Sequence, residues 1–265
     1  MEFPATSASA LLLVFFGISL PLTLVFAIRA RAKRLPAFRP LPGIAQLRAH
    51  MSDVSESGKP LHVATGASQP GVIGPTAETI ASLLIAQRIT EETIRRGGKV
   101  ALTSGDIVAH TALRGTLHQA YRQAGFASDY QGDAVQLVAQ NTPVSYAAGV
   151  AARYAAEPVA ASMIAGNYGA EALLISEEGA ARGVWQVAAT SSLDALPVLA
   201  ISADATLIGE ELFAAEAYLS EMPGPKARLL TQDALRWMIL VLLVIGIIWQ
   251  VLALVQPGLS LPALS

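Results

Sequence analysis

The chain contains no cysteine. Disulfide bonds, thiolate catalysis and cysteine-ligated zinc or iron–sulfur sites are therefore excluded, and the absence fits a domain that stays in a reducing compartment. Histidine is also scarce. The four histidines, His50, His62, His110 and His118, show no HExxH or comparable ligand spacing, so the sequence predicts no metal site.

Charged residues make up only 14% of the 265 residues, and the formal net charge is −2. Nucleic-acid binding requires clustered lysine and arginine, so nucleic acid is not an expected partner. The catalytic templates are missing too, because the chain has no GxSxG elbow, no P-loop ending and no GxGxxG spacing. We therefore predict no catalytic residue and no cofactor.

Two long apolar runs stand out against this background, at residues 8–28 and 237–255, and neither carries a charged side chain. Each is long enough as a helix to cross the roughly 30 Å of a bilayer's hydrocarbon core. A buried core helix is the alternative for both runs. A cleavable signal peptide is a further alternative for the first run.

Basic residues flank both runs on the side that faces the middle of the chain, at Arg29, Arg31, Lys33, Arg34 and Arg39 and at Lys226, Arg228 and Arg236. A signal peptide expects the opposite order. The positive-inside rule places the central region in the cytoplasm and both termini outside. The predicted organisation is an extracytoplasmic tail (1–7), a transmembrane helix (8–28), a basic connector (29–60), a cytoplasmic domain (61–227), a stalk with the second transmembrane helix (228–255) and an extracytoplasmic tail (256–265).

Short β-like runs alternate with helical stretches through the central region. Strands are expected at 61–65, 99–103, 134–139, 159–165, 184–189 and 197–202, and helices at 77–96, 107–124, 144–156, 170–181 and 207–220. Within the connector, a short amphipathic turn is expected around 44–51. Continuous apolar strands suit a parallel sheet that is covered on both faces. The predicted fold class is α/β, a Rossmann-like three-layer domain with a mainly parallel sheet, flanked by two transmembrane helices. The strand order cannot be read from the sequence.

The loop after the first strand, residues 65–76, is the most suggestive candidate for a binding site. It contains Gly66, Gly71, Gly74 and Thr76. Glycines there would let backbone amides approach an anion at the start of the next helix. The alternative is a loop whose glycines only make turns and whose Thr76 caps the helix.

Polar residues also follow other predicted strands, and in a parallel α/β sheet ligands bind at these strand ends. The candidates are Ser104, Asp106, Asn167, Gly169 and Glu171. Ordinary helix capping is the alternative explanation for serine, aspartate and asparagine at such positions.

Three segments carry a resemblance to a known family: residues 167–175, 208–219 and 146–150. They resemble an uncharacterised bacterial membrane-anchored family, the domain of unknown function numbered 6754. The resemblance covers roughly residues 58–255 and leaves the first apolar run outside. It implies no activity, but it makes Gly169, Glu171, Gly209 and Glu210 more attractive as site residues.

These observations lead to two hypotheses about function. The first is a membrane-anchored structural or interaction subunit that contacts the lipid bilayer and acts as a scaffold, either as a homo-oligomer or as a subunit of a membrane complex. Its alanine-rich helices leave little polar surface for solvent and favour such assembly. The alternative is a membrane-tethered sensor that binds a nucleotide or another anion through the 66–76 loop.

Overall fold

The computed structural model of the protein describes residues 5–32, 36, 38–67, 73–140 and 142–255. The chain divides into two compact units. One unit is the segment Phe38–Glu221, which we call the α/β domain. The other unit consists of the flanking segments, Met1–Ala37 and Met222–Ser265.

The α/β domain is built on one sheet of six strands, and every pair of neighbouring strands is parallel. The order across the sheet is β3-β2-β1-β4-β5-β6, which is the order of the Rossmann fold. The predicted α/β class with a parallel sheet is therefore confirmed. The strands are β1 (Leu61–Ala64), β2 (Val100–Ser104), β3 (Val135–Leu137), β4 (Ala161–Ala165), β5 (Trp185–Thr190) and β6 (Ala205–Ile208).

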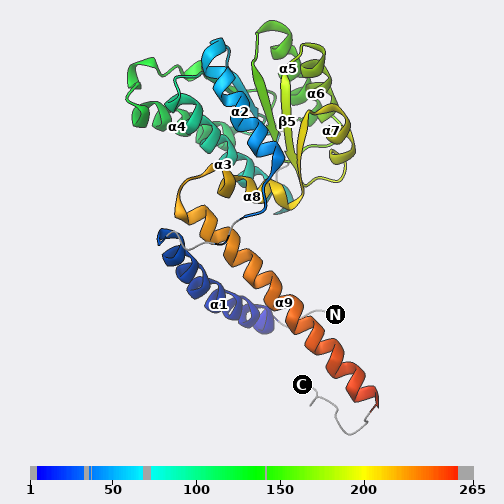
Figure 1. Cartoon of the computed structure of the whole chain (residues 1–265). Helices are drawn as coiled ribbons and strands as arrows, with labels where there is room; N and C mark the ends of the chain where they lie inside the picture. The colour runs from blue at the N-terminus through cyan, green and yellow to red at the C-terminus, as the bar shows by residue number, and fades with distance from the viewer. Residues whose placement is uncertain (1–4, 33–35, 37, 68–72, 141, 256–265) are drawn as a thin grey trace. The chain divides into compact units, whose positions relative to one another are not determined.

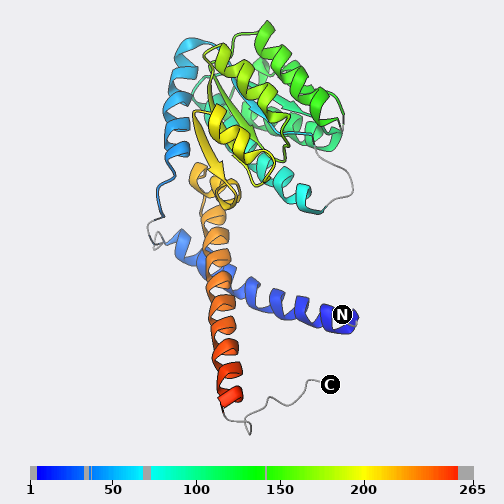
Figure 2. The same ribbon diagram turned by 90° about the vertical axis from the view of Figure 1, so that its right-hand side faces the viewer.

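Helices cover both faces of this sheet (Figures 1 and 2). One face carries α2 (Pro42–Ser57), α3 (Ile73–Arg95), α4 (Ile107–Ala124) and α8 (Glu210–Leu219), and the other carries α5 (Pro143–Ala156), α6 (Ala172–Ala181) and α7 (Leu196–Ser202). Two short 3-10 helices, η1 (Ala127–Asp129) and η2 (Gly132–Ala134), precede β3. Because β–α–β crossovers are right-handed, the helices change faces where the chain passes from β3 to β4.

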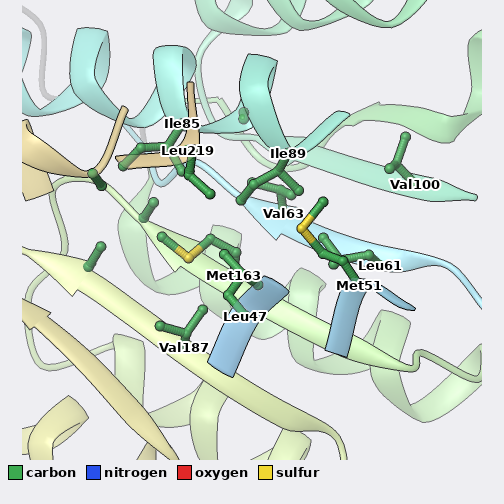
Figure 3. Close-up of a cluster of buried hydrophobic side chains, with 14 of the residues drawn as sticks. Leu47, Met51, Leu61, Val63, Ile85, Ile89, Val100, Met163, Val187 and Leu219 are labelled. Carbon is green, nitrogen blue, oxygen red and sulfur yellow. The ribbon is translucent and has the colours of Figure 1, made fainter. Parts of the chain in front are cut away.

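The larger core lies between the sheet and the face that carries α2 and α3 (Figure 3). Leu47 of α2 and Ile85 of α3 point into it, together with Met163 of β4. Side chains alternate along β1, so Val63 faces this core while Ala64 faces the smaller core under α5 and α6. All four residues of β1 are buried, as expected for a central strand of a parallel sheet.

The two ends of the α/β domain are tied together. The Arg48 Nη2 atom of α2 donates a hydrogen bond to the Tyr218 carbonyl oxygen at the end of α8 (2.8 Å), where a cation also complements the helix dipole. The Tyr218 hydroxyl donates to the Arg39 carbonyl oxygen (2.6 Å), and the rings of Phe38 and Tyr218 are 5.8 Å apart. Both connections to the flanking segments therefore leave from one place on this domain.

Three local predictions were wrong. Residues 197–202 form helix α7 and not a strand, because Pro197 lies in the first turn of a helix, where it fits well. The last strand, β6, was not predicted, and its residues 207 and 208 fall in the helix predicted for 207–220, which begins at Glu210 instead. The expected short turn at 44–51 is the full helix α2, which also begins with a proline, Pro42.

The flanking unit consists of α1 (Ala5–Arg31) and α9 (Pro223–Val255). The helix α9 runs unbroken through the predicted stalk and second transmembrane helix. Among the residues that the structure describes, its part Pro223–Leu252 is the one helix that is long and apolar enough to cross a membrane. The sequence predicted two such helices. The first predicted span is helical as part of α1 (Ala5–Arg31).

Candidate functional site

The strand order creates a switch point between β1 and β4, where the chain leaves the sheet in opposite directions. Ligands of open α/β sheets bind in the crevice at the carboxyl ends of such strands. Gly66 follows β1 there with a φ of +81°, and a Cβ atom at this position would lie 2.8 Å from the Asn167 carbonyl oxygen. Only glycine allows this approach of the two loops without strain.

A buried carboxylate holds the loops at the switch point together. Glu78 of α3 is only 5% exposed. Its two carboxylate oxygens accept hydrogen bonds from the Asn167 side-chain amide and from the Ser191 hydroxyl. These groups come from the segments that follow β1, β4 and β5. Burying a charge is costly unless the charge is hydrogen-bonded. These two hydrogen bonds therefore stabilise the Glu78 carboxylate and connect the loops that carry Asn167 and Ser191.

Two buried tyrosines lie beneath the same loops. The Gly66 N–H donates to the Tyr146 hydroxyl (3.3 Å), and the Tyr146 hydroxyl donates to the Thr103 carbonyl oxygen (3.2 Å). The rings of Tyr146 and Tyr168 are 6.4 Å apart. Burial raises the pKa of both tyrosines, so both phenols stay neutral at physiological pH.

A buried polar network continues from Tyr146 across the sheet. The His62 Nε2 atom lies 3.0 Å from the Thr103 hydroxyl, and His62 Nδ1 lies 2.8 Å from the Tyr154 hydroxyl. The Tyr154 hydroxyl in turn lies 2.5 Å from the Ser162 hydroxyl. Burial, together with the nearby Arg153 guanidinium, lowers the pKa of His62 to about 3. His62 and Ser162 are fully buried, so this serine and histidine stabilise the fold and are not reached by substrate.

Several predicted site residues act within their own loops. The Ser104 hydroxyl donates to the Asp106 carbonyl oxygen (3.1 Å). The Asp106 carboxylate accepts from the Ala109 N–H (2.7 Å), which caps α4. The Gly169 N–H donates to the Glu171 carboxylate (2.8 Å) at the start of α6. These contacts are those of helix caps and turns.

The structure brings only some of the predicted residues together. Gly66 and Asn167 meet at the switch point, and the turn containing Ser104 and Asp106 adjoins them, because the Gly105 N–H donates to the Gly66 carbonyl oxygen (2.9 Å). Gly74 and Thr76 belong to the first turn of α3. Gly71 lies outside the described residues. Glu210 begins α8 after β6, two strands away from β4.

The sequence missed Glu78 as a site residue. Ser191 follows a strand that ends where a cleft is expected, but it was not selected among the site residues. Glu78 lies inside a helix, where an acidic residue near the start is already explained by the helix dipole. Among the described residues, no group of three or more possible ligands could hold a metal ion.

Exposed apolar side chains surround this site. They lie at the carboxyl ends of strands or in the first turn of the helix that follows. We call these eight residues the apolar rim: Ile107, Val108, Leu137, Val144, Leu173, Leu174, Leu193 and Ile208. Val108 is 73% exposed and Leu193 is 82% exposed.

Every charged residue that accompanies the apolar rim is acidic. The acids are Asp106, Glu171, Asp194, Glu210 and Glu211. Where described, the loops that follow the six strands and the first turns of the next helices contain no lysine and no arginine. The described loops that follow the strands therefore carry exposed apolar and acidic side chains.

Comparison with known proteins identifies one family. The family model described as Domain of unknown function (DUF6754) matches residues 3–258. The resemblance noted in the sequence is thus confirmed, but its limits were wrong, since the match also includes the first apolar run. No curated protein and no solved structure matches the chain.

Proposed function

The chain belongs to the DUF6754 family, and we propose that it is a membrane-anchored interaction subunit that docks a partner protein on the carboxyl edge of its sheet. The observation that carries this proposal is the apolar rim. Eight large apolar side chains with substantial exposure lie along the carboxyl edge of the sheet. Fully burying a side chain such as Val108 or Leu193 contributes about 1.5–3 kcal/mol, and several of them together are needed to outweigh the roughly 4–15 kcal/mol cost of association.

The proposed anchor is a pair of transmembrane helices. α9 supplies the second one, and the apolar run within α1 supplies the first. The basic residues beside both runs favour a cytoplasmic location of the α/β domain, by the positive-inside rule. The contacts of Tyr218 with Phe38 and Arg39 support this arrangement, because both connections start from one point of the domain.

The acidic character of the rim favours a protein partner over the lipid surface. The inner leaflet carries anionic lipids and attracts basic segments, not acidic ones. A second copy of the same edge would set carboxylates against carboxylates, which is unfavourable at an interface. The partner that fits is another subunit of a membrane complex, with a contact face that is apolar and basic.

Native gel electrophoresis of gently solubilised membranes tests this proposal. We expect the wild-type chain to migrate in a complex larger than one chain. Replacing Val108 and Leu193 together by aspartate should release the chain from that complex. The matched control is Ile201→Asp, because Ile201 is 89% exposed and lies at the end of α7, on the opposite edge of the sheet.

Three results would count against the proposal. These are a wild-type chain that migrates alone, a V108D/L193D variant that stays in the complex, and a control that dissociates as readily. A complex that contains only copies of this chain would replace the proposed partner by self-association.

The Glu78 cluster favours ligand binding as a second candidate function. A carboxylate at the switch point repels phosphate, but it accepts hydrogen bonds from hydroxyl or amino groups, as the acidic residue of a Rossmann site does from a ribose. A thermal-shift screen with nucleosides and nucleotides tests this candidate. Stabilisation by nucleosides that disappears in Glu78→Gln would support it, and the absence of any stabilisation would remove it.

A further inference from the structure

A separate cavity opens at the opposite edge of the sheet, where the strands begin. Its volume is about 700 Å³, which lies in the usual range for small-molecule sites. Pro60, Lys99 and Ala134, which precede or begin the first three strands, contribute to its wall. The carboxyl edge and its apolar rim take no part in it.

One wall of the cavity carries an arginine with more donors than partners. The Arg153 side chain is only 11% exposed. Its Nη2 atom donates to the Glu157 carboxylate (3.0 Å), whereas Nε and Nη1 are buried and have no hydrogen-bond partner among the described residues. A guanidinium has five N–H groups, and leaving buried ones unpaired is unfavourable. The Arg153 side chain as a whole lines the cavity, and a guanidinium there attracts an anionic partner. The buried Nε and Nη1 atoms are not themselves exposed to the cavity.

The charges around the cavity indicate what kind of ligand it accepts. Two cations line it, Lys99 and Arg153, together with three carboxylates, those of Asp129, Asp133 and Glu157. Glu157 already pairs with Arg153. A phosphate or another polyanion would meet the remaining two carboxylates and be repelled. A molecule with one carboxylate and one ammonium group can pair with the cations through its carboxylate and with the acidic side chains through its ammonium group.

Aromatic side chains complete the wall. Tyr121 and Phe126 line the cavity between the charged groups. Burial raises the pKa of Tyr121, and the nearby Asp129 carboxylate raises it further, so the phenol stays neutral and remains a hydrogen-bond donor. Aromatic rings offer contact area to an apolar side chain.

We propose that this cavity binds a small zwitterion of the amino-acid class. Its carboxylate contacts the Arg153 guanidinium, its ammonium group lies toward Asp129 and Asp133, and its side chain packs against Tyr121 and Phe126. The cavity lies away from the apolar rim, so a ligand bound there would not compete with a partner docked on the rim.

Thermal unfolding of the full chain in detergent, measured with each of the twenty L-amino acids in turn, tests this proposal. Calorimetric titration follows for any amino acid that raises the Tm. We expect at least one to bind, and Arg153→Gln to weaken its binding at least tenfold. Without ligand, R153Q should be no less stable than the wild type, because the substitution removes unpaired buried donors. A purely structural role for Arg153 predicts a lower Tm instead.

The matched control is Arg182→Gln. Arg182 also pairs with a glutamate four residues away, Glu178, but it does not line the cavity. Its loss should leave binding unchanged. If R153Q does not fold, Arg153→Lys, which keeps the charge but loses the planar guanidinium, should still weaken binding. The proposal fails if no amino acid raises the Tm, if binding survives in R153Q, or if inorganic phosphate binds through Arg153 in place of amino acids.

Discussion

The buried His62 makes the stability of the α/β domain depend on pH in a way that can be calculated. Its pKa falls from 6.5 to about 3 on folding because of its complete burial. Below pH 6.5 the unfolded chain therefore takes up a proton that the folded chain refuses. The stability that His62 contributes is complete above pH 6.5 and is lost as the pH falls toward 3. At pH 4.5, two pH units below the unfolded value, the loss amounts to about 2.7 kcal/mol.

His62→Gln isolates this effect, because glutamine can form hydrogen bonds but does not titrate. For a domain of this size the loss corresponds to a fall in Tm of roughly 5–10 °C. We expect the Tm difference between pH 7 and pH 4.5, measured by thermal unfolding in detergent, to be smaller by about this amount in H62Q than in the wild type. His118→Gln, at an exposed position of α4, is the control and should keep the wild-type difference. An equal Tm difference between pH 7 and pH 4.5 in H62Q and in the wild type would contradict the claim that His62 is buried and neutral.

Three further substitutions test the packing of the α/β domain by thermal or urea unfolding. Gly66→Ala should lower stability by about 1–3 kcal/mol, because a Cβ atom would clash with Asn167 and φ is positive; an unchanged stability would contradict the close approach of these loops. Leu47→Ala should cost about 2–5 kcal/mol, since Leu47 is fully buried in the larger core, and a loss below 1 kcal/mol would contradict that packing. Asp106→Ala should cost about 1 kcal/mol through the lost cap of α4, and no loss would argue against the cap.

The sequence predicted the repeating β–α units of the domain well, because each long helix carries its own signals. The helix 107–124 was predicted with its observed bounds, since Asp106 caps its start and Gly125 ends it with a positive φ. The errors at α7 and β6 have one cause. A helix of seven residues and a strand of four are too short for their periodicity to be read, and the apolar residues of α7 resemble those of a strand.

The candidate site was less predictable than the fold, because it depends on the strand order. Gly66 and Asn167 were each selected as residues that follow strands, but only the adjacency of β1 and β4 brings them together. Glu78 of α3 then joins Asn167 to Ser191 by accepting a hydrogen bond from each side chain. The apolar rim was missed for the same reason: its residues are scattered along the sequence and meet only at the carboxyl edge of the sheet.

Accessibility of a single cysteine at Leu193 is the most direct test of a partner that covers the carboxyl edge. The wild-type chain has no cysteine, so Leu193→Cys and Ile201→Cys each create one defined site for a maleimide. In native membrane vesicles with the cytoplasmic side outward, we predict that L193C is protected and I201C reacts, whereas both react after purification in detergent. Equal reactivity of the two positions in the native membrane would contradict the account.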